Sequence, residues 1–98
     1  MVKNNYQFTS NVWEYSGKGA WIFVTVPQNV SSEIRNSFKE YEEGWGRLKI
    51  DAKIGKTNWK TAIWFDSKNQ TYLLPLKSEI RKKENILLNS EIEVIISI

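Results

Sequence analysis

The sequence predicts a mainly β fold, a small closed or split β-barrel with two short helices and a pseudo-twofold internal repeat. Three observations indicate this class: apolar and polar side chains alternate along several segments, turn residues separate those segments, and one strand, helix and strand order occurs twice. The 98 residues, 41% of them hydrophobic, suffice for one core, because domains of this size bury about 60 to 70% of their unfolded surface. We therefore expect a single β-barrel domain over residues 1–98.

Two segments alternate strictly between apolar and polar residues, which is typical of strands with one buried and one solvent-exposed face. In residues 47–54 four apolar side chains alternate with charged ones, and residues 91–98 repeat the pattern. The side chains expected in the core are Leu48, Ile50, Ala52, Ile54, Ile92, Val94, Ile96 and Ile98. Those expected at the surface of the first strand are Lys49, Asp51 and Lys53.

Two further pairs of segments predict hairpins. Residues 7–15 and 21–26 flank residues 16–19, whose glycines can adopt the positive φ of a tight turn. Residues 59–65 and 71–74 flank a short polar connection, so we expect a second antiparallel pair there.

Two short helices interrupt the strands. In the first, Ser31 or Ser32 can cap the N-terminus, and Gly44 ends the helix. Its apolar face, at helical spacing, consists of Ile34, Phe38 and Tyr41. The second helix begins near Ser78 and is barely two turns long.

A repeated tetrapeptide points to an internal duplication. Residues 32–35 and 78–81 both read Ser-Glu-Ile-Arg, and each copy follows an apolar segment that ends at proline. Each copy also precedes a turn and an alternating strand. We therefore expect residues 21–54 and 70–98 to superpose as strand, helix and strand about a pseudo-twofold axis.

The composition excludes most familiar active sites. The sequence has no cysteine and no histidine, which removes disulfides, thiolate or imidazole metal sites, and nucleophiles activated by histidine. It has no P-loop, dinucleotide fingerprint or calcium loop, and no carboxylate pair whose spacing requires a shared cleft. We expect no catalytic residue, no metal and no cofactor, hence a non-enzymatic protein; an enzyme would need an unusual lysine, tyrosine or arginine site.

Charge and aromatic content favour binding. Residues 1–46 carry a net charge of −1 and residues 47–98 one of +4, and the chain has five tryptophans, more than so small a core requires. Trp45 lies between two glycines, and Arg47 follows two positions later, so we expect both residues at a surface contact. Basic and aromatic residues also interleave in residues 56–60, an arrangement that could stack bases and neutralise phosphates. A nucleic-acid-binding barrel is therefore the alternative to a module that binds a small ligand or a protein.

Several segments together resemble a known family. They are residues 21–27, 44–50, 54–55, 59–61 and 72–77, followed by Arg81-Lys82. In this order they are similar to the DUF1905 family of small bacterial and archaeal proteins. The resemblance implies a closed or split β-barrel with short helices, and the family has no established activity. Together with the aromatic and basic residues, it leads us to expect a binding or interaction module of DUF1905 type. The family favours Gly-Asp before the last strand, where this sequence has Asn89-Ser90.

The expected ligand site lies in the most recognisable of these segments. Lys77 and Arg81 are four residues apart, so one face of the short second helix presents both cations. With Trp59, Thr61 and Tyr72 they would form a cationic, aromatic-lined pocket for an anionic or planar ligand at one barrel end. The alternative for Arg81 is a structural contact that ties this helix to the barrel.

The sequence predicts no contact with a membrane. No window holds the 18 or more apolar residues of a spanning helix, and residues 1–7 lack the apolar stretch of a signal peptide. We expect a cytoplasmic protein whose partner is an unknown small ligand or another protein.

Overall fold

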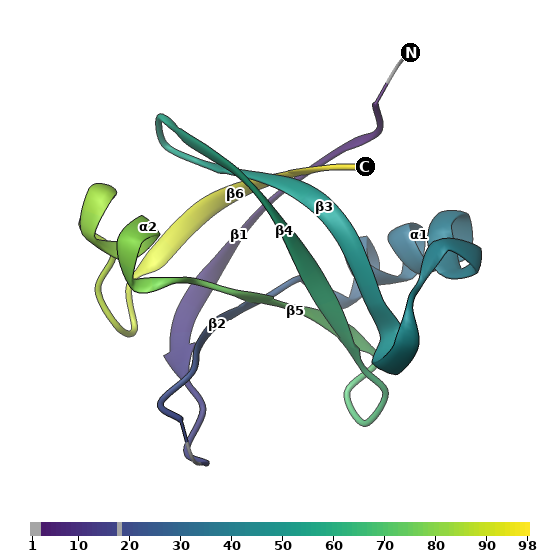
Figure 1. The fold of residues 1–98 in the computed structure, drawn as a ribbon, viewed down its shortest axis with the longest axis horizontal. Helices are drawn as coiled ribbons and strands as arrows, with labels where there is room; N and C mark the ends of the chain where they lie inside the picture. Colours follow the sequence, from purple (N-terminus) through teal and green to yellow (C-terminus); the bar gives the residue numbers. More distant parts are fainter. Residues whose placement is uncertain (1–2, 18) are drawn as a thin grey trace.

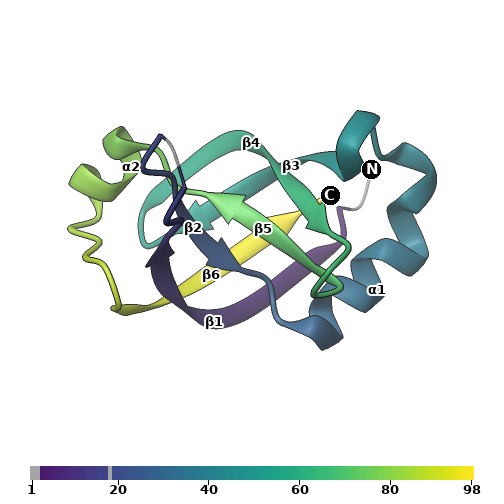
Figure 2. The ribbon, with the colours of Figure 1, turned by 90° about the horizontal axis from the view of Figure 1, so that it is seen from below.

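Six antiparallel strands close into a barrel, and two helices lie at its opposite ends (Figures 1 and 2). The computed structural model describes residues 3–17 and 19–98. The strands are β1 (Asn5–Glu14), β2 (Ile22–Thr25), β3 (Arg47–Ile54), β4 (Thr57–Asp66), β5 (Thr71–Pro75) and β6 (Glu91–Ser97). The helices are α1 (Gln28–Phe38) and α2 (Ser78–Lys83), and two short 3₁₀ turns, η1 (Lys39–Tyr41) and η2 (Gly44–Gly46), connect α1 to β3. The predicted fold class, mainly β with a barrel and two short helices, is confirmed.

The barrel core forms where the alternation predicts it. All four apolar side chains of β3 are at most 5% exposed, and Val94 and Ile96 of β6 are fully buried. Ile92 and Ile98 are partly buried and pack against the same core. On the opposite face of β3, Lys49 and Lys53 are exposed and Asp51 is half-buried. The predicted register of β3 is therefore correct, because a shift by one residue would have turned its apolar side chains outward.

The strand order has the twofold symmetry that the repeated tetrapeptide predicts. The order around the barrel is β1-β2-β5-β4-β3-β6, with β6 closing onto β1. This order is unchanged when the two halves of the chain are exchanged, that is, when β1 takes the place of β4, β2 that of β5 and β3 that of β6, and the reverse. Strands β2 and β5 pair with each other, and so do β3 and β6. The two strand, helix and strand segments thus occupy equivalent places in the barrel.

The predicted cap of the first helix is wrong. Helix α1 begins at Gln28, and the residue at its N-cap is Pro27, which has an extended ψ of 150° and offers no side-chain cap. Ser31 lies inside α1 and is fully buried. Its hydroxyl donates to the Val26 carbonyl at 2.9 Å and accepts the Tyr72 backbone N–H at 3.0 Å. Ser31 therefore ties α1 to strand β5 instead of capping the helix.

The ends of the helices also differ from the prediction. Helix α1 ends at Phe38, before η1 and well before Gly44, and Tyr41 is 70% exposed instead of joining the apolar face. Helix α2 begins at Ser78, as predicted. Among the described residues, no helix combines the length and apolarity needed to cross a bilayer.

The predicted turns contain residues with a positive φ, the left-handed region of backbone conformation. Gly19 has a φ of 100° between β1 and β2, as the first hairpin requires, whereas Lys18 lies outside the described residues. Asn89 has a φ of 66° just before β6. Asparagine adopts this conformation more readily than most residues, so it can stand where the family favours glycine.

Candidate functional site

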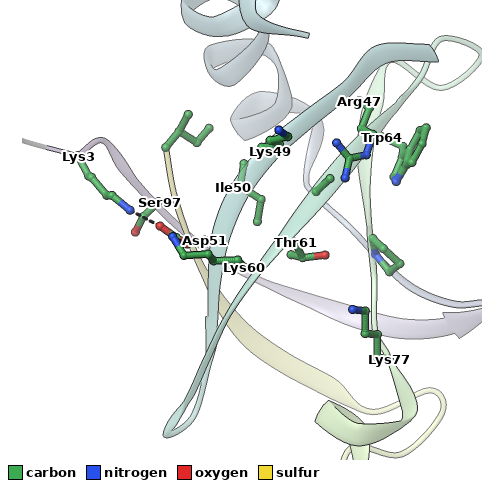
Figure 3. Close-up of a pocket in the computed structure, with 13 residues that line it drawn as sticks. Lys3, Arg47, Lys49, Ile50, Asp51, Lys60, Thr61, Trp64, Lys77 and Ser97 are labelled. Atoms are coloured by element: carbon green, nitrogen blue, oxygen red, sulfur yellow. Dashed lines mark hydrogen bonds and ion pairs between the residues drawn. The ribbon is translucent and has the colours of Figure 1, made fainter. Parts of the chain in front are cut away.

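A groove of about 570 Å³ runs beside the β3–β4 hairpin and is bounded on its other side by the segment that follows β5 (Figure 3). It exists because β4 pairs with β5 only through Trp64–Asp66, whereas β3 pairs with β4 along its full length. The first part of β4 therefore diverges from β5. We call this feature the basic groove, because the cations that line it are Lys3, Arg47, Lys49, Lys60 and Lys77.

Two carboxylates neutralise only part of this charge. Asp51 accepts a hydrogen bond from Lys3 and lies 3.7 Å from the Lys60 ammonium. Glu43, just outside the groove, pairs with Arg47 at 2.5 Å and with Lys49 at 3.7 Å. The hydrogen bond from Lys3, followed by the charges of Lys3 and Lys60, holds the pKa of Asp51 below its usual value.

Lys77 forms no ion pair with any residue that the structure describes. It extends from the segment after β5 toward the middle of the groove, and Figure 3 shows it across from Thr61. A free ammonium in a concave surface attracts anions more strongly than one already paired with a carboxylate. The groove therefore has a net positive charge and an unpaired cation.

An aromatic residue stands at one end of the basic groove. Trp64 is 38% exposed, and the Arg47 guanidinium lies 5.7 Å from the centre of its ring. The two residues are cross-strand partners in β3 and β4, and Figure 3 shows them side by side. Sequence reasoning missed Trp64 as a site residue, although it occupies an outward position of the predicted hairpin.

A second depression, of about 330 Å³, adjoins the groove on the outside of β2 and β5. We call it the aromatic hollow; it is lined by Tyr15, Trp21, Phe23, Trp64, Leu73 and Pro75. Trp64 and Pro75 line both the hollow and the groove. The two features are therefore parts of one continuous surface.

The comparison with known families gives one match. The family described as "Domain of unknown function (DUF1905)" matches residues 8–96, nearly the whole chain. The chain belongs to the DUF1905 family. The resemblance of its motifs is thereby confirmed. A comparison with curated proteins finds no match.

The five predicted ligand residues of this DUF1905 protein do not line one cavity. Thr61 and Lys77 line the basic groove. Lys77 and Arg81 share a smaller hollow of about 210 Å³, in which the aromatic residue is Trp21 rather than Trp59. Trp59 is partly buried against the core, and its indole N–H has no hydrogen-bond partner among the described residues.

Tyr72 is fully buried beneath α1. It pairs with Phe65, which follows Trp59 by six positions along β4, or roughly 20 Å at about 3.3 Å per residue. Its hydroxyl donates to Glu42. Burial, together with this hydrogen bond and the charge of Glu42, raises the pKa of Tyr72 well above its usual value. Tyr72 therefore stays a neutral phenol in the interior of the DUF1905 fold.

Arg81 makes a contact that the structural alternative predicts. Its Nε donates to the Leu76 carbonyl at 3.1 Å, which links α2 to the end of β5.

The two residues expected at a surface contact differ in their exposure. Trp45 is 90% exposed, whereas Arg47 reaches into the basic groove. Among the described residues of this DUF1905 chain, no three carboxylates gather closely enough to hold a metal ion.

Proposed function

We propose that this DUF1905 protein is a non-enzymatic binding module that takes an anionic ligand in the basic groove. One observation carries the proposal: five cations line the groove, and among the side chains that the structure describes only Asp51 within it and Glu43 at its edge oppose them. The volume of about 570 Å³ lies in the range of about 300 to 1,000 Å³ that is typical of small-molecule sites.

The excess of cations over carboxylates in the groove supports an anion rather than a neutral ligand. Lys60 is 91% exposed at its side chain and shares Asp51 with Lys3, so one carboxylate serves two ammonium groups. Lys77 has no carboxylate partner among the described residues. An anion placed between Lys60 and Lys77 would gain favourable Coulomb energy without breaking a buried ion pair.

The protonation states of the nearby groups support binding without catalysis. Asp51 has a lowered pKa and an ion-pair partner, which makes it a weak base at neutral pH. Tyr72 has a raised pKa and is buried away from the groove, which makes it a poor proton donor for a bound ligand. Thr61 and Ser97 line the groove, but a hydroxyl needs an adjacent base to act as a nucleophile.

The proposal is tested by isothermal titration calorimetry of the protein with inorganic tripolyphosphate at low salt. The double variant Lys60→Gln/Lys77→Gln should bind about 2- to 30-fold more weakly, because each exposed ion contact contributes about 0.2 to 1 kcal/mol. Lys68→Gln/Lys82→Gln is the matched control, since it removes the same charge from exposed positions outside the groove. Equal weakening by both variants would show that net charge, and not the groove, attracts the anion.

A further inference from the structure

The aromatic hollow exposes more aromatic surface than a small soluble domain needs. Trp21 is 57% exposed, Tyr15 50% and Trp64 38%, and all three surround the same depression. Isolated exposed aromatic residues are common, but a contiguous group around a depression is typical of a binding surface.

The turn before β2 leaves room for two of these rings, and one of them stacks on a neighbouring ring. The Trp21 ring stacks on Phe23 with centroids 6.2 Å apart and planes 12° apart. A Cβ atom at Gly19 would lie 2.9 Å from Nε1 of Trp21, and one at Gly17 would overlap the Tyr15 ring. The two glycines thus leave room for the indole and the phenol beside the turn. A base that stacks on Trp21 would meet an indole that already stacks on Phe23.

Cations flank the aromatic hollow on two sides. Arg47 lies beside Trp64 at the border with the basic groove. On the other side, Trp21 shares the smaller hollow with Lys77 and Arg81. Pro75 lines all three depressions, so the aromatic rings lie between positively charged groups on one surface.

We infer that this surface binds nucleotide units, with the base stacked on Trp21 and Trp64 and the phosphate held by Lys77, the cation of the basic groove that has no ion pair among the described residues. The inference rests on the proposed function, because it assigns the anion of the basic groove to a phosphate. Planar bases stack on aromatic side chains irrespective of sequence, and neighbouring cations neutralise the backbone. The same chemistry is offered by a free mononucleotide and by an unpaired strand, whereas a duplex hides its base faces.

The direct test compares a fluorescein-labelled thymidine oligonucleotide with an abasic strand that has the same number of phosphates. A length of roughly eight nucleotides matches the site sizes of small single-strand-binding folds, about 4 to 16 nucleotides. Fluorescence anisotropy should show tighter binding of the thymidine strand. Trp21→Ala and Trp64→Ala should each weaken it about 5- to 100-fold, the range expected for the loss of one stacked base.

Tyr41→Ala is the matched control, because Tyr41 is an aromatic residue that is 70% exposed and lines neither the groove nor the aromatic hollow. It should leave the affinity for the thymidine strand unchanged, and no tryptophan variant should alter binding of the abasic strand. Circular dichroism confirms that each variant is folded. Two further probes complete the set: thymidine monophosphate, and the thymidine strand paired with a complementary adenosine strand. If the monophosphate binds as tightly as the single strand, the ligand is a free nucleotide.

Several results would overturn the inference. They are equal affinity for the thymidine and abasic strands, unchanged binding by Trp21→Ala and Trp64→Ala, and a preference for the duplex. If tripolyphosphate still binds and depends on Lys60 and Lys77, the proposed anion site survives this failure. If the tryptophan variants weaken the strand and the Lys60→Gln/Lys77→Gln variant does not, the assignment of the phosphate to the groove fails instead.

Discussion

The two copies of the Ser-Glu-Ile-Arg segment show how one sequence serves two ends of the barrel differently. Their isoleucines behave alike: Ile34 of α1 is fully buried, and Ile80 of α2 is 4% exposed. Their arginines do not. Arg35 places its guanidinium 3.6 Å from the centre of the Phe65 ring, whereas Arg81 donates to the Leu76 carbonyl. The repeated topology fixes where the apolar side chain packs, and local neighbours determine the contact of the arginine.

The residue before each copy differs more strongly. Ser31 is buried and joins α1 to β5 through two hydrogen bonds. Lys77 holds the equivalent sequence position before the second copy, and it is exposed in the basic groove. The same position thus secures the fold at one end of the barrel and provides a free cation at the other. A fold with this twofold symmetry can in this way use a position for packing in one half and leave the equivalent position exposed in the other.

The largest expected effect tests what the two ends share. Ile34→Ala and Ile80→Ala should each lower the free energy of unfolding by about 2 to 5 kcal/mol, because each leaves a cavity under its helix. Urea denaturation monitored by tryptophan fluorescence measures both. A cost below about 1 kcal/mol for one of them would mean that only one helix is part of the cooperative core.

The next effect tests where the ends differ. Ser31→Ala should cost about 1 to 3 kcal/mol, because it leaves the Val26 carbonyl and the Tyr72 N–H buried without partners. The control Ser78→Ala, at an exposed position that starts α2, should cost less than about 0.5 kcal/mol. Similar costs for the two variants would contradict the structural role assigned to Ser31.

Arg81 allows a test of the two alternatives for its role. Arg81→Lys keeps the charge and removes Nε, so loss of the bond to Leu76 should lower the melting temperature by about 4 to 8 °C for about 1 kcal/mol. Binding of tripolyphosphate should stay unchanged. The reverse outcome, normal melting with lost binding, would show that Arg81 is a ligand residue.

The smallest expected effect is on the pH dependence of the free energy of unfolding, and it arises from Tyr72 at the α1 end. The raised pKa of Tyr72 means that its neutral form adds stability below about pH 10, its unfolded value, and that this stability is lost as the pH rises further. Between about pH 8 and pH 11, the free energy of unfolding should therefore fall more steeply for the wild type than for Tyr72→Phe. Parallel pH profiles would show that Tyr72 ionises equally in the folded and unfolded protein.

The fold was predictable because its signals are local. The alternation in β3 and β6 sets which side chains enter the core, and glycine or asparagine marks the turns. The role of Ser31 was not local. It depends on Tyr72, which is distant in the sequence and meets Ser31 only when β5 lies beside β2. A serine before a helical pattern resembles a cap until its long-range partner is known.

The candidate site was predicted less well than the fold, for a geometric reason. Trp59 and Tyr72 lie in adjoining strands, but the hairpin pairs Tyr72 with Phe65, near the opposite end of β4 from Trp59. The basic groove also combines Lys3, Lys60 and Lys77, which come from three separate segments. Lys3 reaches the groove because β1 pairs with β6 and β6 with β3, and Lys77 borders it where β4 diverges from β5. No spacing in the sequence encodes these pairings.

The most direct measurement of the central claim is a ¹H–¹⁵N chemical-shift titration of the intact protein with tripolyphosphate. Binding in the basic groove predicts that the shifted amides cluster in β3, in the first part of β4 and around Lys77. The amides of α1 near Ser31 and Arg35 should remain unshifted at the same ligand concentration. Shifts that cluster at the α1 end, or that spread evenly over the exposed lysines, would contradict the assignment of the binding surface to the groove.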